Sequence, residues 1–177
     1  MKRLLLVMAL ALTALTASSQ KKVLVSYFSA SGKTEAVAQK LQKVMGADIF
    51  KIEPQTAYSD ADLDYRNPNA RCSVEMRDPK SRPALAKAKN DVSKYDVIFI
   101  GFPIWWATAP RIINSYLESA DFSGKTVILF ATSGSSSIDK SCSDLKTAYP
   151  ALIWKGGRLL TNATEEDMAA WKKELEL

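Results

Sequence analysis

Short runs of apolar, often β-branched residues recur along the chain, separated by segments with helical periodicity. The clearest runs are residues 23–28, 97–101 and 127–131, and weaker ones lie at 48–52 and 153–160. Continuous apolar runs of this length are typical of strands that are buried on both faces of a sheet. Their alternation with helical segments predicts an α/β fold, in which helices cover both faces of a parallel sheet.

Four segments have the apolar spacing of amphipathic helices. They are residues 35–45, 110–117, 139–148 and 165–175. Gly46 is placed to end the first helix, and Pro110 suits the first position of the second. Thr164 precedes three acidic residues and is therefore a plausible N-cap for the last helix.

Residues 53–84 differ from the rest of the chain. Four prolines interrupt this polar stretch, and it has no lasting periodicity. So long an irregular segment is usually a functional or covering loop, and a plain surface excursion is the alternative. Residues 85–94 are predicted to form a short helix over the sheet.

Five parallel strands in one short domain favour the doubly wound order 2-1-3-4-5. In that order the ligand crevice opens at the carboxyl ends of the first and third strands. Residues 29–34 and 102–109 follow those two strands. The two segments are therefore expected to lie side by side.

The segment 29–34, SASGKT, joins the first strand to the first helix. The first N–H groups of a helix have no internal partner and carry partial positive charge, so this turn favours an anion such as phosphate. Ser29, Ser31 and Thr34 add hydroxyl groups, Gly32 allows close approach of the backbone, and Lys33 adds charge. The alternative is an ordinary turn and N-cap built from the same residue types. The segment matches neither the Walker A pattern nor the dinucleotide G-x-G-x-x-G pattern.

Trp105 and Trp106 are adjacent in the loop after the third strand. Adjacent side chains tend to diverge, so one indole is expected in the core. The other is expected to be partly exposed and available to stack on a flat ligand.

Composition excludes several kinds of site. The chain has no histidine, which rules out a Ser-His-Asp triad, a Cys-His nucleophile and an imidazole-bound metal. Its two cysteines, Cys72 and Cys142, are too few for a zinc site and too far apart for a CxxC pair. The basic residues are spread along the chain, so nucleic-acid binding is not expected.

The N-terminus has the pattern of a secretory signal peptide in residues 1–19. Lys2 and Arg3 precede an apolar stretch that ends in small residues. Cleavage there would remove two positive charges and lower the net charge from +5 to +3. An uncleaved N-terminal anchor is the alternative. We expect an exported, periplasmic protein without stable membrane insertion after cleavage, comprising residues 20–177 and acting as a monomer.

Three loops carry a resemblance to the flavodoxin family, and in particular to its exported bacterial members. The matching pieces are SYFSASGKTEAVA after the first strand, GFPIWWATAP after the third and FATSGSSSI after the fourth. The pieces LDYRNPNAR, EMRDP and RP of the long loop also resemble that subgroup. Together with the strand order, the resemblance covers residues 22–177. It implies a flavodoxin-like domain that binds FMN non-covalently.

The resemblance also implies which residues hold the cofactor. The FMN phosphate would be held by Ser29, Ser31, Gly32, Lys33 and Thr34. One side of the isoalloxazine would be lined by Pro103, Ile104, Trp105, Trp106, Ala107 and Thr108. The ring edge would be contacted by Thr132, Ser133, Gly134 and Ser135. No catalytic residue and no metal site are predicted.

Three features depart from the best-known flavodoxins. Residues 132–138 contain no aromatic side chain to close the outer face of the ring, which is therefore expected to be open. The chain is mildly basic rather than acidic, so docking to the usual basic partners is not implied. Cys72 and Cys142 lead to the hypothesis of a disulfide that pins the long loop, with two buried, unpaired thiols as the alternative.

The leading functional hypothesis is an FMN-binding electron carrier that serves a redox partner protein or a small acceptor. The second is an FMN-dependent reductase of quinones or similar acceptors; no nicotinamide motif supports it. The third is a protein that keeps this fold but binds a small phosphate ligand or a protein and no flavin. The tryptophan pair disfavours it, because a ring site without flavin would expose a large apolar surface.

Overall fold

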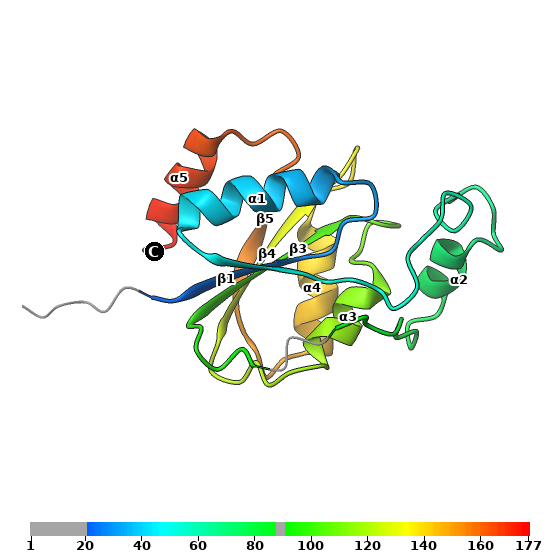
Figure 1. The fold of residues 1–177 in the computed structure, drawn as a ribbon, viewed down its shortest axis with the longest axis horizontal. Coiled ribbons are helices and arrows are strands. Elements are labelled where there is room, and N and C mark those ends of the chain that lie inside the picture. The colour runs from blue at the N-terminus through cyan, green and yellow to red at the C-terminus, as the bar shows by residue number, and fades with distance from the viewer. Residues whose placement is uncertain (1–20, 88–90) are drawn as a thin grey trace, which may run out of the picture.

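The computed structural model describes residues 21–87 and 91–177, and its centre is a sheet of five parallel strands. The strands are β1 (Val23–Tyr27), β2 (Asp48–Lys51), β3 (Val97–Pro103), β4 (Thr126–Thr132) and β5 (Ile153–Leu159). Their order is β2-β1-β3-β4-β5, which confirms the predicted α/β fold (Figure 1). The predicted signal peptide, residues 1–19, lies outside the described residues.

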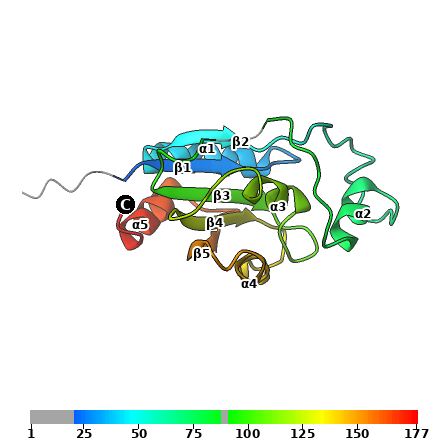
Figure 2. The same ribbon diagram turned by 90° about the horizontal axis from the view of Figure 1, so that it is seen from below.

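Helices cover both faces of the sheet. Four of them are α1 (Lys33–Met45), α3 (Arg111–Leu117), α4 (Asp139–Ala148) and α5 (Glu165–Glu174). Figures 1 and 2 show α1 and α5 on one face and α3 and α4 on the other. Within the part of the chain that the structure describes, no helix is both long and apolar enough to cross a bilayer.

Alternating strand residues supply two separate cores. Leu24 and Ile98 pack into the core beneath α3 and α4, whereas Val25 and Phe99 pack into the core beneath α1 and α5. Successive side chains of a strand point to opposite faces of the sheet. Because both faces are covered, both sets of positions are apolar, which explains the continuous runs in the sequence.

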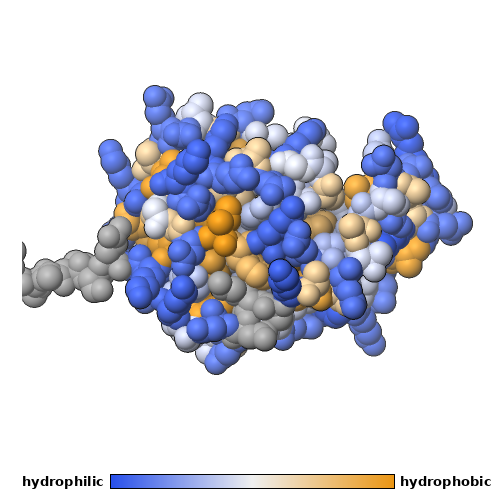
Figure 3. Space-filling view, viewed as in Figure 1, coloured by the Kyte–Doolittle hydropathy of each residue, from blue (hydrophilic) through white to orange (hydrophobic). Residues whose placement is uncertain are grey.

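Between β2 and β3, residues 52–87 and 91–96 contain one short helix, α2 (Arg71–Arg77), that the sequence did not reveal. We call residues 53–86 the excursion. Figures 1 and 3 show α2 as a lobe beyond the sheet edge at which β1 ends. The predicted helix over 85–94 is wrong: Leu85 forms an isolated antiparallel bridge with Pro54, and no helix occurs in residues 85–87 or 91–94. Two backbone hydrogen bonds close the base of the excursion. The Gln55 N–H donates to the Ala84 carbonyl, and the Ala86 N–H donates to the Glu53 carbonyl.

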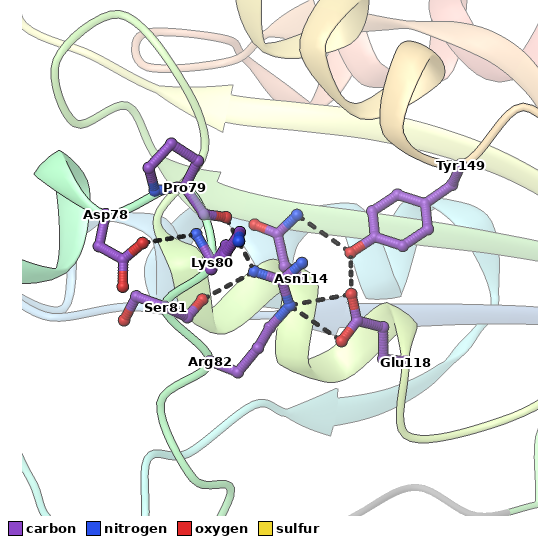
Figure 4. A network of polar contacts seen from close by, with 8 residues as sticks. All are labelled: Asp78, Pro79, Lys80, Ser81, Arg82, Asn114, Glu118 and Tyr149. Atoms are coloured by element: carbon purple, nitrogen blue, oxygen red, sulfur yellow. Dashed lines mark hydrogen bonds and ion pairs between the residues drawn. The ribbon is translucent and has the colours of Figure 1, made fainter.

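The returning arm of the excursion is tied to α3. The Arg82 Nε donates to both carboxylate oxygens of Glu118, at 2.9 Å each, and Tyr149 Oη donates to Glu118 Oε1 (2.7 Å). Asn114 Nδ2 donates in turn to Tyr149 Oη, and the Arg82 guanidinium also binds the carbonyls of Pro79 and Ser81 (Figure 4). This network fixes where the excursion rejoins the body of the protein.

Candidate functional site

The loop between β1 and α1 leaves the N-terminus of α1 without a side-chain cap. Gly32 is the N-cap residue, with φ of 80°, and no side chain of the described residues caps the first turn. By contrast, α5 has a complete capping box between Thr164 and Asp167. The hydroxyl groups of residues 29–34 are therefore not used for capping. The first N–H groups of α1 remain available to an external acceptor.

One hydroxyl of this loop is buried without a partner. Ser29 Oγ has no hydrogen-bond partner among the described residues, although it is shielded from solvent. A buried polar atom of this kind costs free energy unless a ligand or water satisfies it. Ser31 and Lys33 are exposed beside it. The loop thus has the donors expected of a phosphate site.

The Thr34 hydroxyl, unlike that of Ser29, has a partner within the protein. Its side chain is buried, and its Oγ1 lies 2.8 Å from Thr132 Oγ1 at the end of β4. The bond joins the first turn of α1 to the last residue of β4. Thr34 therefore links the two strand ends, and its predicted contact with the phosphate stays a prediction.

The loop after β3 contains a tight turn with unusual backbone angles. Trp105 and Thr108 exchange two backbone hydrogen bonds of 3.0 Å, and the two residues between them, Trp106 and Ala107, have φ of 48° and 61°. A turn with positive φ at both central positions is normally built from Gly, Asn or Asp. Left-handed non-glycine residues are strained and cluster at ligand sites. The turn holds Trp106 out from the sheet edge.

Replacing Ala107 with glycine is expected to stabilise the protein by about 0.5–1 kcal/mol. Relief of the left-handed strain is worth about 1–2 kcal/mol, and the added freedom of glycine in the unfolded chain offsets about 0.4–1 kcal/mol. The free energy of unfolding by urea, without added ligand, measures this. Ala36→Gly on the exposed side of α1 is the control and should destabilise instead. A loss of stability in Ala107→Gly would contradict the assigned strain.

The two tryptophans diverge as predicted. Trp105 is partly buried and packs edge-on against Phe28 and Tyr58, with ring centroids 5.7 and 5.5 Å apart. Trp106 is 49% exposed. One indole therefore anchors the loop in an aromatic cluster, and the other is presented to solvent or a ligand.

A cavity of about 420 Å³ lies between these loops and the excursion. Its lining residues are Ala30, Ser31, Leu63, Tyr65, Cys72, Pro103, Ile104, Trp105 and Trp106. Its size and mixed aromatic and polar lining are typical of small-molecule sites. The cavity lies where the loop after β1 meets the loop after β3. Leu63, Tyr65 and Cys72 of the excursion form a further wall, and these three residues were not among the predicted cofactor contacts.

The third predicted group, residues 132–135, lies outside this cavity, and its predicted contact with the ring edge stays a prediction. Ser133 Oγ accepts the N–H groups of Ser135 and Ser136 within its own turn. Ala107 and Thr108 are also absent from the lining, and Thr108 Oγ1 donates instead to Asp144 (2.6 Å). Residues 132–138 have no aromatic side chain, whereas Tyr65 of the excursion, which is 65% exposed, contributes one to the lining of the cavity.

Tyr58 links the excursion to the aromatic cluster. Its Oη donates to Glu75 Oε2 (2.5 Å), while Arg71 Nε donates to Glu75 Oε1 (2.6 Å). The Arg71 guanidinium lies 4.1 Å from the Tyr58 ring centroid and also binds the Thr56 carbonyl. Burial, and then the hydrogen bond to Glu75, raise the pKa of Tyr58 far above its ordinary value. Tyr58 therefore stays protonated and donates to Glu75.

Removing the Tyr58 hydroxyl by Tyr58→Phe is expected to lower the free energy of unfolding by about 1.5 kcal/mol. Hydrogen bonds to charged groups contribute about 1.5–3 kcal/mol, and the aromatic contact with Trp105 is kept. Urea unfolding followed by tryptophan fluorescence measures the change. Tyr65→Phe is the matched control and should change stability by less than about 0.5 kcal/mol. Equal effects of the two variants would show that the Glu75 contact contributes nothing.

The hypothesised disulfide is not formed. Cys72 and Cys142 are both free thiols. Cys72 is buried in α2 and lines the cavity, and burial raises its pKa. Cys142 instead lies on α4 against Gly157 of β5, where it contacts the core beneath α4. The excursion is held by hydrogen bonds and ion pairs rather than by a cross-link between these two residues.

Comparison with known proteins identifies the family. A profile described as flavodoxin matches residues 22–175. The chain belongs to the flavodoxin family. No curated protein sequence matched this flavodoxin significantly.

Two crystal structures of Bacteroides flavoproteins are similar to this flavodoxin over most of its length. The protein from Bacteroides eggerthii is 50% identical, with a TM-score of 0.86 over 89% of this chain and 99% of that chain. The protein from Bacteroides uniformis is 49% identical, with a TM-score of 0.85 over 88% of this chain and 99% of that chain. A flavoprotein from Lactobacillus acidophilus, solved in complex with FMN, shares the fold at 23% identity, with a TM-score of 0.65 over 78% and 93%.

Proposed function

We propose that this flavodoxin is an electron-transfer protein that binds FMN non-covalently at the carboxyl ends of β1, β3 and β4. The observation that carries the proposal is the buried, unpartnered Ser29 Oγ beside the uncapped start of α1. A phosphate there would satisfy this hydroxyl and the open N–H groups of the first turn. Family membership adds support, as does the FMN bound by the Lactobacillus flavoprotein.

The residues that would hold FMN form two groups. Ser29, Ser31, Gly32 and Lys33 would bind the phosphate. The cavity wall formed by Trp105, Trp106 and Tyr65 would contact the ring. FMN, when bound, supplies the redox chemistry. The chain's own contribution is to orient the ring and exclude water from one side of it. An apolar, aromatic wall also disfavours negative charge on the ring, which lowers its reduction potential.

The first test is the visible absorption spectrum of the purified protein, before and after incubation with excess FMN. We expect a flavin spectrum with one FMN per chain, released intact on denaturation. Riboflavin, which lacks the phosphate, should bind at least about 100-fold more weakly, because several charge-assisted hydrogen bonds are lost. A protein that stays colourless with excess FMN would overturn the proposal.

An FMN-dependent reductase of quinones or similar acceptors is the second candidate. The observation in its favour is that Tyr65 and Trp106 are both largely exposed at the cavity wall, so a small acceptor can approach. Steady-state turnover of a quinone with NADH or NADPH separates the two candidates. Turnover at enzymatic rates would favour the reductase. A flavin that the nicotinamide leaves oxidised would favour the carrier, which receives electrons from a protein partner.

Export to the periplasm and a monomeric state remain part of the proposal. Export rests on the signal-peptide pattern of residues 1–19. N-terminal sequencing of the protein from cell fractions tests the first, because a mature chain that begins at Gln20 is expected in the periplasmic fraction. Retention of Met1 in a membrane fraction would instead support the uncleaved anchor.

A further inference from the structure

A second cavity, of about 270 Å³, adjoins the first on the outer side of Tyr65 and Trp106. These two exposed aromatic residues line both cavities. The remaining wall of the second cavity comes mainly from the excursion and includes Arg66, Met76 and Arg77. None of these three residues belongs to the proposed FMN site. The second cavity is therefore a separate compartment that shares one wall with it.

The two arginines of the second cavity lack an acidic partner. Arg71, Arg82 and Arg158 each form an ion pair with a glutamate. Within residues 21–87 and 91–177, neither Arg66 nor Arg77 forms one. The Arg66 guanidinium lies 5.4 Å from the Tyr65 ring centroid, and Arg77 Nη2 donates to the Pro68 carbonyl (2.6 Å).

The nearest acidic residues in the sequence are engaged elsewhere. Asp64 Oδ1 accepts the backbone N–H of Arg66 (3.1 Å). Asp78 Oδ1 accepts the backbone N–H of Lys80 (2.8 Å). Each carboxylate thus stabilises a local turn rather than pairing with a guanidinium. Most of the guanidinium N–H groups of Arg66 and Arg77 are left for a ligand.

The chemistry of the lining selects a class of ligand. Tyr65 and Trp106 offer flat faces for an aromatic ring, and the Met76 thioether adapts to such rings. Arginine binds carboxylate, sulfonate and phosphate groups through paired N–H donors. The cavity volume of about 270 Å³ lies just below the usual range for drug-sized ligands, which suits a ligand of one or two fused rings.

We propose that the second cavity binds a small planar aromatic anion, held by its ring against Tyr65 and Trp106 and by its acidic group on Arg66 and Arg77. This inference goes beyond the proposed function, because it assigns a second ligand site whose occupancy does not depend on FMN. It also gives the excursion a role other than covering the first cavity.

The test is isothermal titration of the full-length protein with naphthalene-2-sulfonate and with its neutral analogue 2-naphthalenemethanol. Each titration is made with and without saturating FMN. We expect the sulfonate to bind with one site per chain in both samples, and about tenfold or more tighter than the neutral compound. Arg66→Gln and Arg77→Gln should each weaken the sulfonate about tenfold and leave the neutral compound unchanged.

Arg66→Gln is the more specific test. Within the part of the chain that the structure describes, the Arg66 guanidinium makes no hydrogen bond, whereas Arg77 Nη2 also donates to the Pro68 carbonyl, and that contact would be lost in Arg77→Gln. Arg66→Lys should restore part of the affinity. Arg158→Gln, on β5 at the far edge of the sheet, is the matched control and should not change binding. Equal affinity for charged and neutral probes would overturn the proposal, as would sulfonate binding that FMN abolishes. FMN content, read by absorption on the same samples, reports separately on the proposed function.

Discussion

Replacing Gly101 with alanine is expected to destabilise the protein by about 3 kcal/mol, the upper end of the usual cost of overpacking a core. Gly101 lies in β3 directly opposite Phe130 of β4. A Cβ atom at this position would lie closer than 3.0 Å to three atoms of the Phe130 ring. Phe130 is fully buried in the core beneath α1 and α5, so its ring has no free space to move into.

Urea unfolding measures this effect. Gly134→Ala is the matched control, because a Cβ there meets no atom within 4 Å, and it should change stability by less than about 0.5 kcal/mol. Phe130→Leu removes the clashing ring atoms, so the double variant with Gly101→Ala should be more stable than the sum of the single effects predicts. Additive effects would contradict the assigned contact, as would equal effects of Gly101→Ala and Gly134→Ala.

The sheet could be predicted from the sequence because its pattern is local. The runs around Val25, Phe99 and Ile128 are almost continuously apolar, with Ser26 as the polar exception, and a strand covered on both faces accounts for this. The order of the strands then followed from their number and from the alternation with helices. The role of Gly101 was not predictable, since it depends on a ring of the neighbouring strand.

The site was predictable only in part, because contacts between residues that are distant in sequence leave no local pattern. Residues 29–33 and the tryptophan pair follow strand ends, and topology alone brings these positions together. The contact between the hydroxyl groups of Thr34 and Thr132 was not predictable, because the two residues are distant in sequence. Helix α2 was missed because seven residues in a proline-rich stretch show no clear helical period. Tyr65 could have been suspected only as one of two tyrosines in a polar stretch.

Replacing Ser31 with aspartate is expected to weaken FMN binding about 100-fold while leaving riboflavin binding within about threefold. Ser31 is exposed and lines the cavity next to Gly32, so the new carboxylate would face the proposed phosphate site without disturbing the core. Two unit charges about 4 Å apart repel by about 4 kcal/mol at an effective dielectric constant of about 20. Exposure to solvent reduces this energy, which leaves a loss of about two decades in affinity.

Fluorescence titration of the apoprotein with each flavin measures the two affinities. Ser137→Asp, in the exposed loop after β4, is the matched control for added charge and should leave both affinities unchanged. The penalty for FMN should shrink as salt rises, because screening shortens the range of the repulsion. Equal losses for FMN and riboflavin would show a damaged ring site rather than a phosphate site. An unchanged FMN affinity would show that the loop after β1 does not bind the phosphate. A carboxylate beside a bound phosphate dianion would necessarily repel it and weaken binding.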